Sequence, residues 1–411
     1  MIMKQDILFI PWRDWDKMKI EGFRTREANI LLELLSREDI NKILCINRSK
    51  IPKIIKKPIE LLVEKGNLKE PIKSGFKETT LVKRPFSKII EVEKKLFILD
   101  LNYHIPNPKG NKLERIEFFE NILKNEITYA INYLGLENHI VWNFDLSRAN
   151  TANYFKRDLL IFDAIDNLLE HNDFKNDRRK IAEQYQKVES TCDLIFSVSE
   201  SIKEDLFKSL EKVTYIPNGV NLRLFRDTPC NIPNDLPRDR PIVGYVGLMQ
   251  ERIDTEGLRK MIMELPNVNF VFIGPVLSPE IFKDIKSIKN VFFLGSKHHS
   301  EIATYINSFD ICIIPHRVNN FTKSMNPLKL YEYLAASKEV VTTPVPPYES
   351  FKDVLHVVEK TEDMSNVINR ILSNPYEKFS KTEINKRIAK ETWTSRVNLM
   401  IKKIKTQIEW K

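Results

Sequence analysis

The chain has 411 residues, of which 42% are hydrophobic and 29% charged, and its formal net charge is +9. These values are typical of a globular protein with two domains of ordinary size. No apolar run approaches the roughly 20 residues that span a bilayer, and the N-terminus lacks the features of a secretion signal. We therefore expect a cytoplasmic protein.

The cysteines are too far apart to form a metal or disulfide framework. Cys45, Cys192, Cys230 and Cys312 include no Cys-x-x-Cys pair. This spacing argues against both a zinc site and a set of disulfides. We expect reduced, buried thiols.

Basic residues are concentrated in one segment. Residues 42–95 contain 15 Lys and Arg against 6 Glu and no Asp, a surplus of +9 that equals the charge of the whole chain. The segment is either a solvated surface or a face that meets anionic lipid or a polyprenyl-diphosphate acceptor. Aromatic residues are sparse there and no binding motif appears, so we expect no nucleic acid.

Short apolar strands alternate with helices in the first half of the chain. This alternation predicts an α/β fold with a doubly wound parallel sheet. Asp163, Asp166 and Ser199 lie at predicted strand ends, as turn, capping or catalytic residues. The predicted strands are 6–10, 43–46, 96–99, 139–144, 159–163 and 193–199, and the predicted helices are 24–36, 115–133 and a charged one that ends at Glu189.

A second domain begins at the turn Pro217-Asn218-Gly219, and the proline-rich stretch 229–241 is the predicted linker. Predicted strands at 241–247, 269–275 and 290–295 each have a glycine at or next to their C-terminal end. Gly244 and Gly247 have the spacing Gly-x-x-Gly, and no phosphate-binding P-loop motif is present. This argues against NAD and against ATP bound through a P-loop.

The most informative stretch runs from Asn326 to Ala336. A buried strand at 309–315 and a loop at 316–325 precede it, and the β-branched run 340–343 follows. Asn326 is a preferred helix cap and Pro327 suits the first helical position, so a helix should begin here. A helix N-terminus beyond the carboxyl edge of a parallel sheet is an anion site, and Glu332 in the second turn could accept from a ribose.

This stretch resembles the nucleotide-binding segment of retaining glycosyltransferases of family four (group 1). The resemblance extends to a bacterial branch that builds cell-surface polysaccharides such as teichuronic acid. It implies the GT-B fold, with two Rossmann-like domains facing across a cleft. Residues 1–216 would bind the acceptor, residues 217–390 would bind a nucleotide sugar, and a final helix at 391–411 would return to the first domain.

The resemblance also assigns candidate residues. Glu332 matches the second of two family glutamates, which binds the donor ribose, whereas Ser324 replaces the first. Arg252 matches a basic residue that pairs with the donor diphosphate. The candidate catalytic residues are Arg252, Ser324 and Asp166, and the candidate nucleotide-sugar-binding residues are Gly247, Arg252, Asn218, Gly219, Asn326, Pro327, Leu328, Lys329 and Glu332.

The implied reaction is sugar (hexosyl) transfer from a nucleoside diphosphate to a hydroxyl of a glycan or lipid-linked glycan, with retention. We expect neither a metal nor another cofactor. We expect no Asp-x-Asp triplet, because the carboxylate pairs Asp163/Asp166 and Asp235/Asp239 do not have that spacing. If residues 42–95 are not simply a solvated surface, they would be the face for peripheral contact with an anionic membrane.

Alternatives remain open. A GT-B epimerase would use the same pocket but would need acidic or histidine groups at the sugar, and a non-catalytic relative would bind the nucleotide sugar without turnover. The candidate side chains also have simpler interpretations. Arg252 could pair with Glu256, and Lys329 could pair with Glu332, at helical spacings of four and three.

Overall fold

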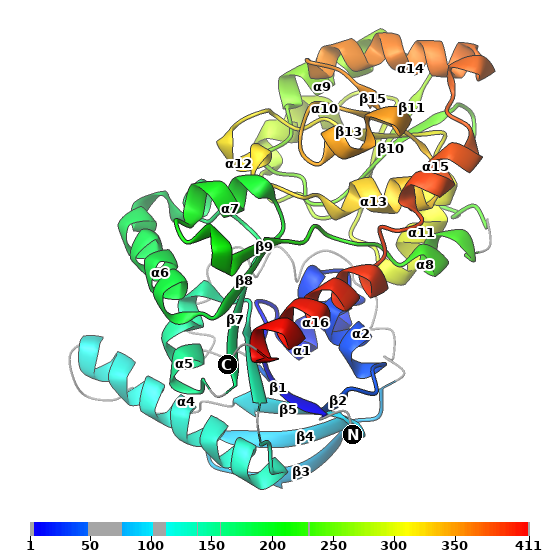
Figure 1. Ribbon diagram of the computed structural model, residues 1–411. Helices are drawn as coiled ribbons and strands as arrows, with labels where there is room; N and C mark the ends of the chain where they lie inside the picture. The colour runs from blue at the N-terminus through cyan, green and yellow to red at the C-terminus, as the bar shows by residue number, and fades with distance from the viewer. Residues whose placement is uncertain are drawn as a thin grey trace. The chain divides into compact units, whose positions relative to one another are not determined.

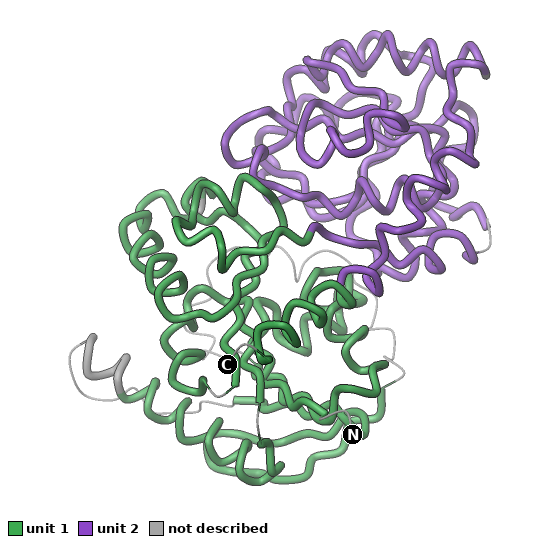
Figure 2. The backbone as a smooth tube through the Cα atoms, in the orientation of Figure 1, with its two compact units in different colours: residues 1–56, 71–216, 397–411 green, residues 57–70, 217–396 purple. Residues whose placement is uncertain are grey.

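The computed structural model describes residues 4–47, 76–101, 112–137, 139–156, 158–228 and 231–409 (Figure 1). These residues divide into two compact units (Figure 2). Unit 1 contains the described residues up to Ile216 and those from Val397 onward, and unit 2 contains Pro217–Arg396. Each unit has its own sheet and its own hydrophobic core.

Unit 1 is built on a nine-stranded sheet in the order β3-β4-β5-β2-β1-β6-β7-β8-β9. Neighbouring strands from β5 to β9 are parallel, which confirms the predicted doubly wound sheet. An antiparallel hairpin of β3 and β4 extends one edge, and the sequence analysis missed it. The strands are β1 (Gln5–Ile10), β2 (Ile40–Ile46), β3 (Thr79–Lys83), β4 (Ser87–Glu93), β5 (Leu96–Leu101), β6 (His139–Asn143), β7 (Leu159–Ala164), β8 (Leu194–Ser197) and β9 (Val213–Tyr215).

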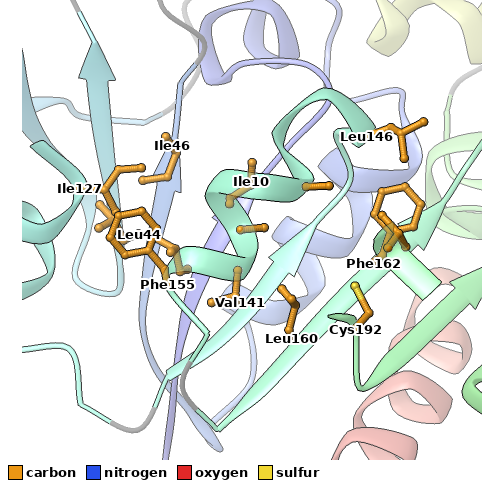
Figure 3. Packing of buried hydrophobic residues seen from close by; sticks show 14 of the residues in the cluster. Ile10, Leu44, Ile46, Ile127, Val141, Leu146, Phe155, Leu160, Phe162 and Cys192 are labelled. Atoms are coloured by element: carbon orange, nitrogen blue, oxygen red, sulfur yellow. The ribbon is translucent and has the colours of Figure 1, made fainter. Parts of the chain in front are cut away.

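Helices cover this sheet, and alternate strand residues point into the core beneath them. Figure 1 shows α5 and α6 on one side of β7 and β8. Ile10, Leu44 and Leu160 from the strands and Ile127 from α4 belong to one buried cluster (Figure 3). The helices of unit 1 are α1 (Trp15–Ile20), α2 (Arg26–Leu35), α4 (Lys112–Leu134), α5 (Ala149–Tyr154), α6 (Arg178–Thr191) and α7 (Glu200–Leu206).

The last helix, α16 (Trp393–Glu409), starts in unit 2, and its residues from Val397 onward belong to unit 1. Buried residues repeat along it at helical spacing, at Val397, Met400, Ile401 and Ile404. Its polar side contacts the turn after α2, because the Lys405 ammonium lies 2.9 Å from the Asp39 carboxylate. This part of the helix is therefore packed on unit 1.

Asp39→Asn should destabilise unit 1 in a pH-dependent way. Hydrogen bonds from Arg37, assisted by Lys405, lower the pKa of Asp39 to about 2. A carboxyl with a lowered folded-state pKa contributes stability above its unfolded pKa, and the contribution is lost as the pH falls through the folded pKa. After allowance for solvent screening, we expect a loss of about 1 kcal/mol at neutral pH. Urea denaturation should show this loss near pH 7 and almost none near pH 2; a difference that is equal at both pH values would contradict the ion pairing.

Unit 2 is built on a six-stranded parallel sheet in the order β12-β11-β10-β13-β14-β15. Its strands are β10 (Ile242–Val246), β11 (Asn269–Ile273), β12 (Val291–Gly295), β13 (Ile311–Ile314), β14 (Glu339–Thr342) and β15 (His356–Val357). Its helices are α8 (Leu222–Arg226), α9 (Thr255–Glu264), α10 (Lys283–Lys286), α11 (His299–Asn307), α12 (Asn320–Lys323), α13 (Leu328–Ala335), α14 (Met364–Ser373) and α15 (Lys381–Ile388).

Helices lie on both faces of the second sheet. Side chains of α11, α13 and α15 pack on one face, and side chains of α9 and α14 pack on the other. Two predictions were wrong. The described part of the 229–241 stretch belongs to unit 2 and does not link the units. The predicted loop 316–325 contains the short helix α12, because Asn319 caps it by accepting from Thr322 N–H.

Among the described helices, none is both long and apolar enough to cross a bilayer. The core of the basic segment, residues 48–75, lies outside the described residues. Flanking basic side chains are engaged within unit 1, since Arg84 pairs with Glu126 and Lys88 with Asp100. Of the cysteines, Cys45, Cys192 and Cys312 are buried free thiols as expected, and Cys230 lies outside the described residues.

Candidate functional site

The strand order of unit 2 reverses between β10 and β13. From β10 the chain moves outward to β11 and β12, and from β13 it moves outward in the other direction to β14 and β15. In open parallel sheets, ligands bind beyond the carboxyl ends of the strands at such a switch point. Here those ends carry Gly247 after β10 and His316 after β13, and α13 follows the next loop.

The start of α13 differs in detail from the prediction. Pro327 is the N-cap residue, and no side chain caps the helix. Asn326 does not act as the cap, because its Oδ1 accepts a hydrogen bond from the backbone N–H of Asn218 at 3.0 Å. In return, the side-chain amide of Asn218 donates to the Asn326 carbonyl at 2.6 Å. The Asn218 turn therefore holds the N-terminus of α13 while leaving the amides of Leu328 and Lys329 without a side-chain cap.

Gly219, in the same turn, has a packing role. A Cβ at this position would lie 2.8 Å from the backbone carbon of Thr392 and the nitrogen of Trp393. Arg396 Nε also donates to the Asn218 carbonyl at 3.1 Å. The structure thus places Gly219 against the backbone at the start of α16, where only glycine allows such a close approach.

Two cationic side chains, Lys329 and Arg252, lie close to Tyr245. Lys329 is buried, and its Nζ donates to the Tyr245 hydroxyl at 2.6 Å while lying 3.9 Å from the centre of the Tyr245 ring. Arg252 is partly buried, and its Nε has no hydrogen-bond partner among the described residues. A buried cation whose partner is a neutral phenol is energetically unfavourable, so this arrangement favours an anionic ligand.

The electrostatics of the site agree with this interpretation. Burial and then the charge of Arg252 hold the pKa of Lys329 well below its usual value, and Glu332 opposes the shift. Burial raises the pKa of Tyr245 to about 12, so the phenol stays neutral and its proton is available for the Leu248 carbonyl at 3.1 Å. Strongly perturbed pKa values at a strand edge are a common mark of a functional site.

In the described residues, the partners seen for Glu256 and Lys329 differ from those of the simpler interpretations. Glu256 pairs with Lys260 at 3.5 Å instead of with Arg252. Lys329 points to Tyr245, and the Glu332 carboxylate lies 4.0 Å from His299 Nε2. Glu332 retains 14% exposure, so an incoming ligand can reach its carboxylate.

Ser324 and Asp166 are placed less favourably for chemistry. Ser324 is buried at the end of α12, and its hydroxyl donates to the Phe321 carbonyl at 2.7 Å. Asp166 lies in unit 1, whereas Arg252 and Ser324 lie in unit 2. It lines a small cavity after β7 with Trp12 and Phe144, and its backbone carbonyl accepts from the Tyr185 hydroxyl. Ser199 is an N-cap, since it accepts from Ile202 N–H at the start of α7.

The chain also contains an Asp-x-Asp triplet that the sequence analysis overlooked, at Asp14-Trp15-Asp16. Asp14 caps α1 by accepting from Lys17 N–H, and Asp16 pairs with Lys19 at 3.3 Å. Both carboxylates therefore serve their own helix. No cluster of three or more His, Cys, Asp or Glu side chains suited to a metal was found in the parts of the chain that the structure describes.

Two glycines at the site, Gly247 and Gly274, leave no room for a side chain. Gly247 and Gly274 follow two adjacent strands with φ of +143° and +133°, values that side-chain-bearing residues rarely adopt. A Cβ on Gly274 would lie 2.1 Å from the Gly247 carbonyl oxygen, and one on Gly247 would lie 2.8 Å from Lys329 Nζ. The two glycines therefore set the position of the backbone beneath Lys329.

Gly274→Ala should destabilise the protein and weaken ligand binding together, because rigid backbone atoms would have to move. We expect a loss of about 2 kcal/mol or more in urea denaturation. The matched control is Gly135→Ala, where φ is also positive, at +60°, but nothing lies within 4 Å of the added Cβ. That variant should lose only about 1 kcal/mol. Equal losses in the two variants would show that the contact with Gly247 is unimportant.

The sequence analysis missed three residues of the site: Tyr245, His316 and His299. Tyr245 occupies an ordinary apolar strand position, and only the fold brings it to Lys329, 84 positions away. His316 had a detectable signal, since a polar residue directly after a buried strand and Pro315 is expected at the carboxyl edge. His299 lies at the first position of α11 and is brought to Glu332 by packing.

Comparison with known proteins identifies the second unit. Residues 240–374 match the family model of glycosyl transferases group 1. Residues 240–374 are a group 1 glycosyltransferase domain. This domain contains Gly247, Arg252, Ser324, Lys329 and Glu332, so the resemblance found in the sequence is confirmed for this part of the chain.

A curated relative shares part of the chain. Over 178 residues the chain is 26% identical to TuaH of Bacillus subtilis (strain 168), whose name assigns it to teichuronic acid biosynthesis as a glycosyltransferase. The match covers 41% of this chain and 45% of TuaH, so it spans less than half of that protein.

Solved structures resemble the whole chain. Sucrose-phosphate synthase from Thermosynechococcus elongatus has a TM-score of 0.68 at 15% identity, covering 99% of this chain and 100% of that one. A trehalose-phosphate synthase from Burkholderia vietnamiensis scores 0.69 at 11% identity, covering 98% and 99%. HepE from Anabaena, in complex with UDP and glucose, scores 0.63 at 11% identity, covering 97% and 99%. At these identities the likeness shows the fold alone, and it confirms the predicted GT-B fold.

Proposed function

We propose that the chain is a glycosyltransferase that moves a sugar, of hexosyl type, from a nucleoside diphosphate to a hydroxyl of an acceptor. The observation that carries the proposal is the buried cation Lys329 beside Arg252 at the switch point of a group 1 domain. A diphosphate supplies the negative charge that these side chains lack. HepE binds UDP and glucose, and a trehalose-6-phosphate-related protein from E. coli is bound to UDP-2-fluoro glucose, which supports a nucleotide-sugar donor.

In this proposal the donor diphosphate contacts Arg252, Lys329 and the first amides of α13. Negative charge increases on the diphosphate as the bond to the sugar breaks, and donors placed in advance stabilise that charge without reorganisation. The departing diphosphate can itself accept the proton of the attacking hydroxyl, so transfer with retention needs no protein nucleophile. We propose that neither a metal nor another cofactor takes part, because the two side-chain cations meet the same electrostatic need. Ser324 is buried and its hydroxyl donates to Phe321, so the proposal does not depend on it.

The proposed acceptor is a glycan or a lipid-linked glycan in cell-surface polysaccharide synthesis, as the name of TuaH suggests. A polyprenyl-diphosphate acceptor would place the enzyme at a membrane, with 42–95 as the basic contact. Reversing Lys53, Lys56 and Lys57 to Glu should then reduce sedimentation with anionic liposomes.

Incubation with a panel of nucleotide sugars and a lipid-linked glycan acceptor tests the function. Release of nucleoside diphosphate only when acceptor is present would identify a transferase. A changed sugar still attached to nucleotide would identify an epimerase, and binding without turnover a non-catalytic relative. Thermal-shift measurements choose the nucleotide first, because a ligand at 100 times its Kd adds about 2.7 kcal/mol of stability.

A further inference from the structure

His316 is a buried histidine at the centre of the site with no assigned role. It lies two residues after the end of β13, at the switch point, and only 1% of its surface is exposed. Neither ring nitrogen has a hydrogen-bond partner in the described residues. Buried polar atoms are almost always paired, so two unpaired atoms in one side chain call for an explanation.

The backbone of His316 is held firmly. Thr343 Oγ1 donates to its carbonyl at 2.7 Å, and an antiparallel bridge joins it to Ile253, next to Arg252. Its ring lies 6.3 Å from the Tyr245 ring, centre to centre, in an edge-on orientation. His316 is therefore fixed beside the same tyrosine that receives Lys329.

The charged groups around His316 come from each element packed against it. Lys329 and Glu332 lie on α13, Arg252 lies on the loop after β10, and the neutral Tyr245 lies on β10. The neighbouring Arg317 is turned to Asp254, at 3.9 Å, and to the Ile253 carbonyl. Burial first, and then the charges of Lys329 and Arg252, hold the pKa of His316 well below its usual value. In the free protein the imidazole is therefore neutral.

We propose that His316 is a proton-accepting member of the diphosphate site, so that binding of a nucleoside diphosphate is coupled to uptake of one proton by its imidazole. The proposal rests on the proposed function of the site. The two negative charges or more of a diphosphate reverse the local potential and favour the imidazolium. The proton comes from solvent, no covalent bond to carbon or phosphorus changes, and the complex gains one positive charge that offsets one charge of the ligand.

The affinity for the nucleoside diphosphate should depend on pH. The free protein disfavours the proton on His316 and the complex favours it, so the complex holds more protons than its separate components. By linkage, affinity must then rise as the pH falls, between the pKa of His316 in the complex and its lower pKa in the free protein. An ordinary histidine titrates near pH 6.5, and the pKa of His316 in the free protein lies well below that value, so the rise in affinity should continue below pH 6.5.

The test is calorimetric titration of UDP, ADP and GDP into the full chain, in buffers of small and of large ionisation enthalpy. The dependence of the observed heat on the buffer gives the number of protons taken up. For the nucleotide that binds most tightly, we expect His316→Phe to lower the number of protons taken up on binding by about half a proton or more at neutral pH. Protons released or taken up by the nucleotide itself cancel in the comparison with wild type.

Two further variants separate the possible origins of the protons. His171→Phe removes a histidine of unit 1 that packs on Phe174, and it should leave the uptake unchanged. Lys329→Met removes the other group whose protonation the site disfavours. Proton uptake by His316 should still be measured in this variant. His316→Gln keeps a polar side chain at the position. Its affinity for the nucleotide should no longer depend on pH in the way that wild type does, even if it still binds near pH 8.

The outcomes are distinct. Binding with equal proton uptake in wild type and His316→Phe would overturn the inference and leave the proposed function intact. Failure of every nucleotide to bind wild type would overturn both. A thermal melt of each variant without ligand identifies misfolding; if His316→Phe fails to fold, His316→Gln decides between the same outcomes.

Discussion

Arg252→Ala should lower kcat/KM for sugar transfer by about two orders of magnitude, comparable to the removal of one oxyanion-type donor. The charge of the guanidinium acts on Lys329 at the switch point, and its Nε has no hydrogen-bond partner among the described residues. Because charge accumulates on the diphosphate in the transition state, kcat should fall more than substrate binding. Steady-state rates with the donor chosen by the nucleotide panel provide the measurement.

Two variants frame this result. Arg252→Lys keeps the charge but loses the planar fork of donors, so its rate should fall between those of wild type and Arg252→Ala. Arg259→Ala removes an exposed arginine of α9 whose guanidinium contacts Met263, and it should act like wild type. A near wild-type rate for Arg252→Ala would place the diphosphate contact elsewhere.

Glu332→Ala should weaken nucleoside diphosphate binding by roughly ten- to a hundredfold for each hydrogen bond to a ribose hydroxyl that is lost. The carboxylate is on the second turn of α13, near the N-terminus proposed to hold the diphosphate, and it remains partly exposed next to His299. A charged acceptor there can bind both ribose hydroxyls. Calorimetric titration into wild type and variant measures the change.

The ligand provides the control for this variant. A 2′,3′-dideoxy nucleotide cannot make the bonds to Glu332, so its affinity should change little, whereas damage to the fold would weaken both ligands equally. The double-mutant logic isolates the carboxylate–ribose interaction. Unchanged binding of the full nucleotide to Glu332→Ala would show that Glu332 is not the ribose residue, and the function transferred from the family motif would lose its main support.

Local sequence patterns predicted most of the parallel strands and the α/β class. Strands such as β10 and β13 are buried on both faces, so they appear as continuous apolar runs that a reader of the sequence can find. The β3–β4 hairpin was missed because most residues of β3 are exposed and it has no such run. The hydrophobic pattern of a strand reflects its burial, and an exposed edge strand is buried too little to show such a pattern.

The sequence by itself determined the α/β class and the boundary turn near Pro217, and it predicted an anion site at α13 with the candidates Arg252, Lys329 and Glu332. These features depend on residues close together in the chain. Only the tertiary structure decided that Asn326 binds Asn218 instead of capping α13, that Lys329 lies on Tyr245, and that His316 is buried without a partner. The physical reason is that these contacts join residues about a hundred positions apart, such as Asn218 and Asn326, whose separation in sequence is 108. Such contacts follow from strand order and helix packing, which local patterns of hydrophobicity and turn residues do not encode.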